Sequence, residues 1–498
     1  MPLPFLPPDK KLTALAAEDA RVLSGVATSV PLCVDLDGSL VLSDTLTELF
    51  ILLIKRKPWL IFVLPFWLLK GKAGFKETIA QRVKLDASSL PYRTELVDWL
   101  REEAASGRML VLASGANHRV VQAVADHFGF FSEIVASFGG TNLTGLAKAK
   151  ALSERFGTFD YIGDAPVDLP VWRAARKAYF CGRTPSQRSL YGRDIKFERV
   201  FPLPRASSIV LWLRALRVHQ WVKNVLMFVP LILAHKVGDT DRLAILCMAF
   251  MAFNLVASSV YILNDLLDLA ADRAHPRKCK RPFASGHLAL GAGLALWPVL
   301  VVAGFALALY ASPLFAAVLA LYYALTVAYS FELKRRALVD VFSLASLYTL
   351  RIIAGAVAAV VALSPWLLGF SIFIFLSLAI VKRVAELHTL HARGVDDPAG
   401  RGYSHADLAM LEILGVAAGY ASVVVLALYV SAPESRVLYA HHQLLWLFAP
   451  LVLFWISRIW LVTHRGQMHD DPIVFAMKDS PSRIVGLVGI LVLELASF

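Results

Sequence analysis

The sequence predicts two parts of different fold class: a doubly wound α/β domain over residues 1–200 and an all-α polytopic membrane domain of about nine transmembrane helices over residues 219–498. Hydrophobic residues make up 57% of the 498 residues, which is too apolar for an ordinary soluble protein. The apolarity is uneven, because runs of membrane-spanning length begin near Ala206 and then alternate with short charged loops. Ahead of them, short apolar stretches, acidic loops and helical segments recur, as in a parallel sheet covered by helices.

The first part contains four short apolar segments that we expect to be strands. They lie within Val30–Leu40, Arg108–Ala113, Phe159–Ile162 and Ala178–Cys181. The first three end in polar residues, which are Asp35 and Asp37, Ser114, and Asp164 with Asp168. Ligands bind outside the carboxyl ends of the strands in open α/β sheets, so these side chains are expected to share one site.

These segments resemble the four motifs of the haloacid dehalogenase-like phosphatase superfamily, in the order that the superfamily has them. DLDGSL is similar to the first motif, Ser114 to the second, Lys148 in GLAKAKAL to the third, and Gly163-Asp164…Asp168 to the fourth. Lys150 is an alternative for the third motif, and an inactive relic of the fold is the alternative to a phosphatase.

The resemblance implies a role for each residue. Asp35 would be the nucleophile that forms an aspartyl-phosphate, and Asp37 the general acid and base. Ser114 and Lys148 would hold the phosphoryl oxygens. Asp164 would complete a Mg²⁺ site with Asp35 and Asp37, and Asp168 would support it.

The stretch from about residue 43 to 92 corresponds to the place where such phosphatases carry a helical cap. Its two apolar pieces are each too short to span a bilayer and are separated by Lys55-Arg56-Lys57-Pro58. We expect an interfacial helical hairpin with Trp59 and Trp67 at the headgroups. The alternative is an apolar cap packed on its own core.

Residues 201–218 are predicted to be a linker followed by an amphipathic interfacial helix at Ser208–Val218. Nine spans follow, near 221–235, 242–263, 289–310, 313–331, 338–361, 365–381, 407–431, 441–462 and 483–498. The loops after the even-numbered spans are rich in Lys and Arg, and the opposite loops are poor in them. By the positive-inside rule, the basic loops and the N-terminal domain lie in the cytoplasm and the protein is a multi-pass protein of the inner (plasma) membrane.

The loop after the second span begins with a set of spaced acids. Asn264, Asp268 and Asp272 are four residues apart, and Asp265 lies about 100° round a helix from Asn264. Oxygen ligands of this kind suit Mg²⁺, which binds one or two carboxylates together with substrate phosphates. Bases follow directly, among them Arg273, Lys280 and Arg281. A solvated positive-inside loop would explain the bases but not the spaced acids.

Further polar residues lie inside or beside the spans. They are Lys223, Asn224, Lys334, Asp340 and Arg351. Intramembrane charges are costly and mark functional sites by default. Lys223 has the alternative of snorkelling to the surface, and Arg351 that of a structural ion pair.

The motif NDLLDLAADRAHPRKCKRP is similar to the NDxxDxxxD motif of the UbiA-type intramembrane prenyltransferase superfamily. The segments RVHQWVKN, YSFELK, LRIIAGA, KRVAEL and MHDDPIVFA resemble one branch of it, the decaprenyl-phosphate phosphoribosyltransferases. The resemblance implies transfer of 5-phosphoribosyl from phosphoribosyl diphosphate to a polyprenyl phosphate. In this view Mg²⁺ is held by the acid-rich residues Asn264, Asp265, Asp268 and Asp272, and the phosphates are bound by Arg273, Lys280 and Arg281. The opposite wall of the site is formed by Lys334 and Asp340. The lipid phosphate is bound by Lys223 and Arg351.

Two other functions stay open at this point. One is an aromatic prenyltransferase that consumes a prenyl diphosphate, and the other is a transporter or scaffold with a regulatory N-terminal domain. If the phosphoribosyltransferase holds, the fused phosphatase is expected to remove the 5-phosphate of the product. A nucleic-acid partner is not expected despite the net charge of +12, because no basic stripe with interleaved aromatic residues occurs.

Overall fold

The computed structural model describes residues 30–63, 66, 67, 69, 71–138, 142–182, 195–203, 207–392, 394, 402–468 and 471–497. Within these the chain forms two compact units. The first consists of residues up to Trp212 together with Asp265–Gly293, and the second of Leu213–Asn264 together with Leu294–Phe498. The segment that carries the predicted magnesium acids therefore packs with the N-terminal domain.

The N-terminal domain is built on a six-stranded parallel sheet with the order β3-β2-β1-β4-β5-β6. The strands are β1 Leu32–Val34, β2 Leu110–Asn117, β3 Glu133–Ser137, β4 Asp160–Gly163, β5 Ala178–Gly182 and β6 Phe197–Pro202. The four predicted strands are confirmed as β1, β2, β4 and β5. Since β1 pairs with both β2 and β4, the loops that follow these three strands lie next to each other.

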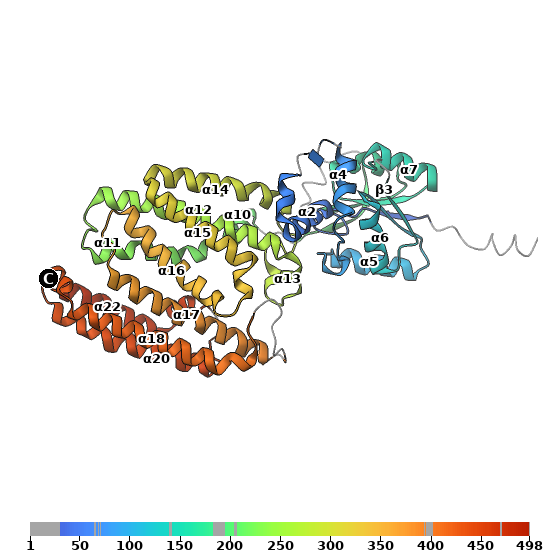
Figure 1. Ribbon diagram of the computed structural model, residues 1–498. Helices are drawn as coiled ribbons and strands as arrows, with labels where there is room; N and C mark the ends of the chain where they lie inside the picture. The colour runs from blue at the N-terminus through green and yellow to red at the C-terminus, as the bar shows by residue number, and fades with distance from the viewer. Residues whose placement is uncertain are drawn as a thin grey trace, which may run out of the picture. The chain divides into compact units, whose positions relative to one another are not determined.

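Helices cover both faces of this sheet (Figure 1). They are α5 Thr94–Ala105, α6 His118–Phe128, α7 Leu146–Phe156 and α8 Leu169–Ala174. Side chains alternate across a strand, so Leu32 and Val34 of β1 join a core with α5 and α6. Cys33 points the other way and joins a second core with α7 and α8. The doubly wound α/β prediction is confirmed for this domain.

The predicted cap region is helical. It contains α2 Thr45–Arg56, η1 Pro58–Phe62, α4 Gly71–Ala80 and η2 Ala87–Ser89. One face of α2 is buried and, like Trp67, belongs to the core of the domain. Trp59, Phe66 and Leu69 are 60%, 68% and 83% exposed, so the cap is not packed entirely on itself.

The membrane domain is helical, as predicted (Figure 1). Among the described residues, eight helices are long and apolar enough to cross a membrane. They are α12 Thr240–Leu267, α14 Leu290–Ala311, α15 Pro313–Phe331, α16 Val339–Ala358, α17 Pro365–His391, α18 Leu408–Ser431, α20 Phe448–His464 and α22 Ser480–Ser497, with η8 His442–Leu447 leading into α20 and η7 His405–Asp407 into α18. Short helices α19 Pro433–Leu438 and α21 Pro472–Lys478 connect some of them.

The first predicted span, 221–235, has a different form. Amphipathic helix α10 Ser208–Ala215 is followed by an eleven-residue 3-10 stretch, η4 Val218–Phe228, and by the five-residue helix α11 Val229–Leu233. Arg217 before η4 has a left-handed φ of 51°, and Pro230 near the start of α11 lacks the N–H of an α-helical residue. One continuous α-helix is therefore not formed here, although the stretch is apolar.

Burial separates the eight long helices into central and peripheral ones. About two thirds of the apolar window of α16 is buried, against 22% for α14 and 17% for α22. α16 packs between α15, α17 and η4, so polar side chains on these elements face protein rather than lipid. The polar clusters of the second unit, described below, lie mainly on α16 and the elements packed against it.

Candidate functional site

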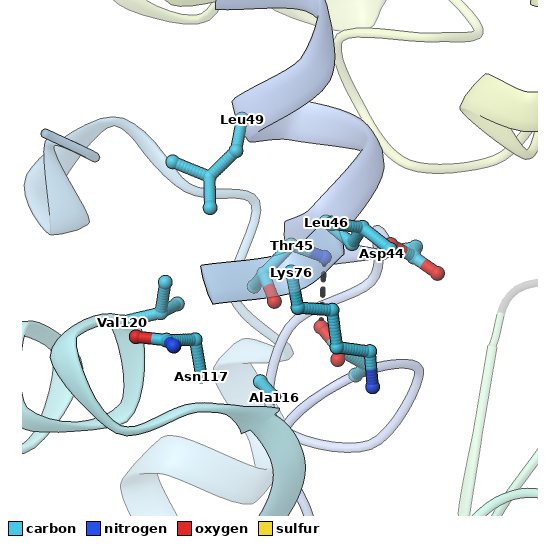
Figure 2. Close-up of a pocket in the computed structure, with 9 residues that line it drawn as sticks. Asp44, Thr45, Leu46, Leu49, Lys76, Ala116, Asn117 and Val120 are labelled. Carbon is cyan, nitrogen blue, oxygen red and sulfur yellow. Dashed lines mark hydrogen bonds between the residues drawn. The ribbon is translucent and has the colours of Figure 1, made fainter. Parts of the chain in front are cut away.

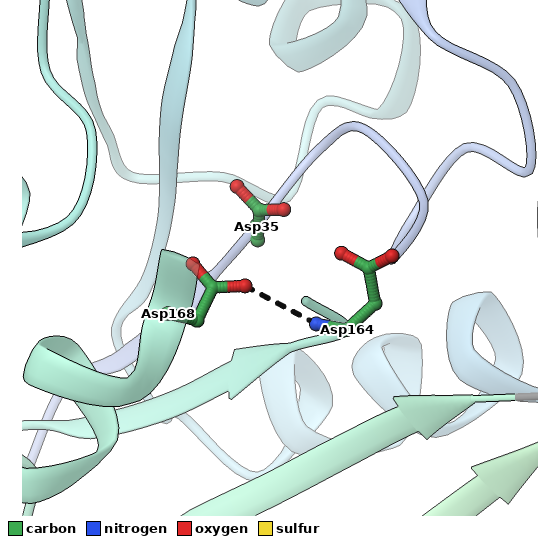
Figure 3. A group of neighbouring side chains, drawn as sticks. All are labelled: Asp35, Asp164 and Asp168. Atoms are coloured by element: carbon green, nitrogen blue, oxygen red, sulfur yellow. Dashed lines mark hydrogen bonds between the residues drawn. The ribbon is translucent and has the colours of Figure 1, made fainter. Parts of the chain in front are cut away.

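The carboxyl ends of β1 and β4 bring three acidic side chains of the N-terminal domain together. Oxygen atoms of Asp35, Asp164 and Asp168 lie within 4.8 Å of one another (Figure 3). Within the described residues this is the one such group of three. Clustered hard oxygen donors are the ligand set that Mg²⁺ prefers, so the residues fit the predicted ion.

Lys148 of α7 supplies the positive charge of this cluster. Its Nζ donates to Asp35 Oδ1 at 2.8 Å and to the Tyr161 hydroxyl at 2.9 Å. Tyr161 in turn donates to Asp168 Oδ1 at 2.8 Å. Lys148 is buried, whereas the side chain of Lys150 is 77% exposed and pairs with Glu154. The alternative assignment of the lysine to Lys150 is therefore set aside.

Burial changes the proton affinity of the acids. It raises the pKa of Asp35 to about 6, an effect that Lys148 counteracts and Asp168 reinforces. Burial and the nearby Asp44 raise the pKa of Asp37 to about 7. Burial, Asp35 and Asp168 raise the pKa of Asp164 to about 8. Such shifted carboxyls are typical of sites where a group must hold or release a proton near neutral pH.

The loop after β1 is held tightly by residues that sequence reasoning did not single out. Gly38 has a φ of +81°, and a Cβ there would lie 2.2 Å from Asp164 Oδ2. Buried Arg93 donates to the carbonyls of Gly38, Ser39 and Phe201. The side chain of Asp37 accepts the backbone N–H of Thr45 at the start of α2. The acids are thus fixed by the cap as well as by the sheet.

Ser114, the second predicted phosphate ligand, lies within β2 and is buried. Its hydroxyl oxygen accepts the N–H of Ala116 at 3.0 Å. β2 lies beside β1 in the sheet, so Ser114 belongs to the same edge as Asp35.

The helix predicted for the magnesium segment Asn264–Asp272 is interrupted at Asp268. Asn264 and Asp265 lie in the last turn of α12, Asp268 is a turn residue, and Asp272 lies in α13 Leu269–Ala274. Asp265 and Asp272 are buried and share one partner, since Arg281 Nη1 lies 3.1 Å from the first and 2.6 Å from the second. The guanidinium of Arg281 thus stands between two carboxylates.

Asp268 and Arg273 of this segment form ion pairs with the N-terminal domain. Asp268 lies 3.4 Å from Lys55 Nζ. Arg273 Nη2 donates to Glu48 Oε1 at 2.5 Å, and its other nitrogens reach the carbonyls of Ser89 and Ala284. The side chains of Arg273 and Glu48 are only 10% and 4% exposed, so Arg273 has a structural role here. Lys280, at the end of η5 Lys278–Lys280, is exposed.

In the second unit, Lys223 and Asn224 of η4 lead into a buried polar network. Lys223 Nζ lies 2.7 Å from Asp471 Oδ2, and Lys382 Nζ lies 3.6 Å from the same oxygen. Sequence reasoning quoted the segment that contains Asp471 without assigning it a role. The carboxylate links two lysines that are far apart in the chain.

Arg351 of α16 is buried among neutral groups. Its Nε donates to Asn224 Oδ1 at 2.7 Å, and its Nη2 to the Tyr322 hydroxyl at 3.2 Å. The guanidinium also lies 5.0 Å from the centre of the Tyr348 ring. Among the described residues no carboxylate forms an ion pair with Arg351, so the alternative of a structural ion pair is not supported. A buried cation held in this way favours an anionic ligand.

Asp340, expected in a substrate-binding wall, is fully buried at the start of α16. Its two carboxylate oxygens accept hydrogen bonds from the Tyr329 hydroxyl and from Arg383. Arg383 directly follows the sixth predicted span, 365–381, where a basic loop was expected, yet its side chain is only 2% exposed. Because both oxygens of Asp340 are occupied, it positions Arg383 and Tyr329. Lys334 lies in η6 Leu333–Arg335 and is half-buried.

The fold and the site define a class of protein: a multi-pass helical membrane protein. It has an acid-rich segment at the end of one long apolar helix and buried cations on its central helices. The chain belongs to the UbiA prenyltransferase family, whose sequence profile matches residues 225–478. It is therefore a UbiA-family membrane transferase. The match leaves the N-terminal domain outside it.

Individual relatives extend over different parts of the chain. The uncharacterized protein y4nM of Sinorhizobium fredii is 39% identical over 471 residues, which cover 92% of this chain and 89% of that protein. Decaprenyl-phosphate phosphoribosyltransferase of Mycobacterium tuberculosis is 38% identical over 201 residues, 40% of this chain and 67% of that enzyme. The structure of a UbiA homolog from Archaeoglobus fulgidus bound to GPP and Mg²⁺ covers 57% of this chain and 96% of its own, with 14% identity and a TM-score of 0.43.

Proposed function

We propose that the membrane domain transfers a 5-phosphoribosyl group from phosphoribosyl diphosphate to a polyprenyl phosphate. The observation that carries this proposal is the set of buried cations on the central helices, above all Arg351, which has neutral partners and favours an anionic ligand. A polyprenyl phosphate acceptor needs such a cation for its own phosphate, in addition to the cations that bind the diphosphate of the donor. The similarity to decaprenyl-phosphate phosphoribosyltransferase supports the same substrates.

The residues divide the reaction between two phosphate sites. Asn264, Asp265, Asp268 and Asp272 would hold Mg²⁺, which when bound neutralises the departing diphosphate. Arg281 and exposed Lys280 bind the diphosphate oxygens. Arg351 and Lys223 bind the lipid phosphate, whose oxygen attacks carbon 1 of the ribose while the bond from that carbon to diphosphate breaks.

Two of the expected ligands receive other roles in this proposal. Arg273 anchors the acid-rich segment through Glu48, and Asp340 positions Arg383 and Tyr329. Lys334 keeps its proposed place in the substrate-binding wall opposite the acid-rich segment.

The test is to supply membranes with labelled phosphoribosyl diphosphate and polyprenyl phosphate. Labelled lipid is expected with the wild type and with Asp241→Asn, a control at the opposite end of α12. Asp268→Asn is expected to lower the yield at least about a hundredfold, as loss of a metal ligand does. Label incorporation only from a prenyl diphosphate into an aromatic ring would favour the aromatic prenyltransferase. Full activity of Asp268→Asn would reject the metal site at Asp268, and no labelled product from either donor would favour a transporter or scaffold.

We propose a second activity, a phosphatase, for the N-terminal domain. Its specific support is the cluster in which Asp35, Asp164 and Asp168 lie within 4.8 Å while Lys148 reaches Asp35 at 2.8 Å. A carboxylate attacks a phosphate monoester only where positive charge offsets their repulsion. Mg²⁺ held by Asp35 and Asp164 would supply part of that charge, and Lys148 with Ser114 the rest.

Two proton transfers complete this reaction. Asp35 attacks phosphorus as the bond to the alcohol oxygen breaks, and the carboxyl of Asp37 gives that oxygen its proton. Asp37, now ionised, accepts a proton from the water that cleaves the aspartyl-phosphate and releases inorganic phosphate. Asp35→Asn is expected to abolish phosphate release, and retained release would reject this mechanism.

We also propose that the chain crosses the membrane nine times, with the N-terminal domain in the cytoplasm. Residues up to Trp212 and Asp265–Gly293 share one compact unit, which supports one crossing of the chain ahead of α12. The eleven 3-10 residues of η4 and the five residues of α11 extend about 30 Å, which equals the hydrocarbon thickness.

A further inference from the structure

A pocket of the N-terminal domain opens beside Asp37, between the sheet and the cap (Figure 2). Its sheet side is formed by Asp37, Ala116, Asn117 and Val120, and its cap side by Asp44, Thr45, Leu46, Leu49 and Lys76. Asp37 is the group that protonates the departing alcohol in the proposed phosphatase. The pocket is therefore the place where that alcohol lies.

Among the residues that the structure describes, Lys76 of α4 is the one basic side chain that lines this pocket. Its Nζ donates to the Gly115 carbonyl at 2.7 Å and to Asn142 Oδ1 at 3.2 Å. Gly115 follows the phosphate ligand Ser114, so these bonds hold the ammonium close to the reacting phosphate, on the cap side. A charged ligand oxygen is a stronger acceptor for an ammonium group than a neutral carbonyl oxygen.

The rest of the lining defines what else the alcohol must offer. The carboxylate of Asp44 caps α2 by accepting the N–H of Thr47, and Asn117 hydrogen bonds to Glu77. The carboxylate of Asp44 can accept further hydrogen bonds from hydroxyl groups, and the amide of Asn117 can both accept and donate them. Leu46, Leu49 and Val120 supply a small apolar wall, which suits the carbon face of a sugar ring.

We infer that this pocket selects a phosphate monoester of a sugar that carries a second anionic group, which Lys76 binds. This inference rests on the proposed phosphatase activity and names its substrate class. A ribose with a 5-phosphate and a phosphodiester at carbon 1 belongs to this class. Lys76 is then a specificity-determining residue, separate from Lys148, which serves the transferred phosphate.

The test uses the full-length protein and two water-soluble probes. One is methyl riboside 5-phosphate, and the other carries a methyl phosphodiester at carbon 1 in place of the methyl group. Phosphate release from each is measured as kcat/KM for the wild type and for Lys76→Met, Lys76→Arg and Lys84→Met. Lys84 is an exposed lysine of the same region and serves as the matched control.

The wild type and Lys84→Met are expected to prefer the phosphodiester probe. Lys76→Met should lower kcat/KM for that probe about tenfold to a hundredfold, the effect of one lost charge-assisted hydrogen bond, and change the other probe less than about twofold. Lys76→Arg should keep most of the preference. If Lys76→Met lowered kcat/KM equally for both probes, Lys76 would instead contact the transferred phosphate. If Lys76→Met lowered kcat/KM for neither probe, Lys76 would not contact the substrate. Both results overturn the inference.

A binding measurement separates this failure from failure of the phosphatase itself. The phosphodiester probe without its 5-phosphate is titrated into the Asp35→Asn protein, which cannot turn over. Weaker binding after Lys76→Met is expected here too. Absence of Asp35-dependent phosphate release with intact Lys76-dependent binding would reject the phosphatase but keep the subsite, and unchanged binding would reject the subsite.

Discussion

Three carboxyl groups of the N-terminal domain, those of buried Asp35 and half-buried Asp37 and Asp164, have pKa values raised to about 6, 7 and 8. Below about pH 4 these groups are protonated in both the folded and the unfolded chain. Between pH 4 and 8 the folded chain keeps protons that the unfolded chain has released, so rising pH favours unfolding. Each group changes the free energy of unfolding by up to about 1.4 kcal/mol per pH unit in its window.

We therefore expect the metal-free N-terminal domain to lose stability from pH 5 to pH 8, and Mg²⁺ to restore it most strongly at pH 8. Hydrogen exchange of peptides from β1 and β4 in the full-length protein, corrected for intrinsic rates, measures this directly. Asp164→Asn should flatten the dependence because it removes the group with the highest pKa. Stability that rises with pH in the absence of metal would contradict this expectation.

Arg281 gives a second prediction at the scale of single residues. It separates Asp265 and Asp272, whose side chains are only 3% and 4% exposed. Arg281→Ala leaves two buried carboxylates without this countercharge and should destabilise the protein by about 1–3 kcal/mol. Millimolar Mg²⁺ should recover part of the stability, but not the transferase activity, because the phosphate ligand is missing.

Thermal unfolding in detergent with EDTA or with Mg²⁺ measures the first effect, and lipid product formation the second. Arg277→Ala, at an exposed base four residues earlier, is the matched control and should change neither. Equal activity of Arg281→Ala and the wild type would remove Arg281 from the diphosphate site.

At the scale of secondary-structure elements, we expect the exposed residues of the cap to contact lipid. Trp59, Phe66 and Leu69 are all more than half exposed, and Lys55, Arg56 and Lys57 lie beside them. Exposed aromatic residues next to bases are typical of elements at a membrane interface. The cap would then hold the phosphatase site against the lipid surface.

Phe66→Asp is expected to lower phosphate release from a lipid-borne substrate about tenfold or more, since burial of one aromatic side chain contributes roughly 1.5–3 kcal/mol. Release from a water-soluble sugar phosphate should not change. Phe138→Asp, at a residue 70% exposed after β3, is the control outside the cap. A parallel loss on both substrates would indicate misfolding of the cap instead of lost membrane contact.

The sequence predicted elements best where one pattern dominates. β1, β2, β4 and β5 are buried apolar runs and were found, whereas β3 (EIVAS) and β6 (FERVFP) mix polar and exposed residues and were missed. The break in the acid-rich helix at Asp268 was also missed, because its periodicity suits one continuous helix. Arg383 was misjudged as a loop base because its position in the sequence, beside Lys382 at the predicted end of a span, gave no sign of its burial against Asp340.

At the scale of the whole molecule, one chain carries the two proposed reaction sites. The acid-rich segment packs in the same compact unit as the N-terminal domain, held by the largely shielded Arg273–Glu48 pair. A product that carries a 5-phosphate on its ribose would be a substrate of the class that the Lys76 pocket suits. Sequence motifs predicted the residues of both proposed sites, but the motifs alone could not show that Arg273 pairs with Glu48 of the N-terminal domain.

The most direct test is mass spectrometry of the lipids made from phosphoribosyl diphosphate and polyprenyl phosphate by the wild type, Asp35→Asn and Asp268→Asn. The wild type should yield polyprenyl-phosphoryl-ribose, Asp35→Asn should accumulate the same lipid with its 5-phosphate, and Asp268→Asn should yield neither. Identical products from the wild type and Asp35→Asn, or ribosylated lipid from Asp268→Asn at the wild-type level, would contradict the account.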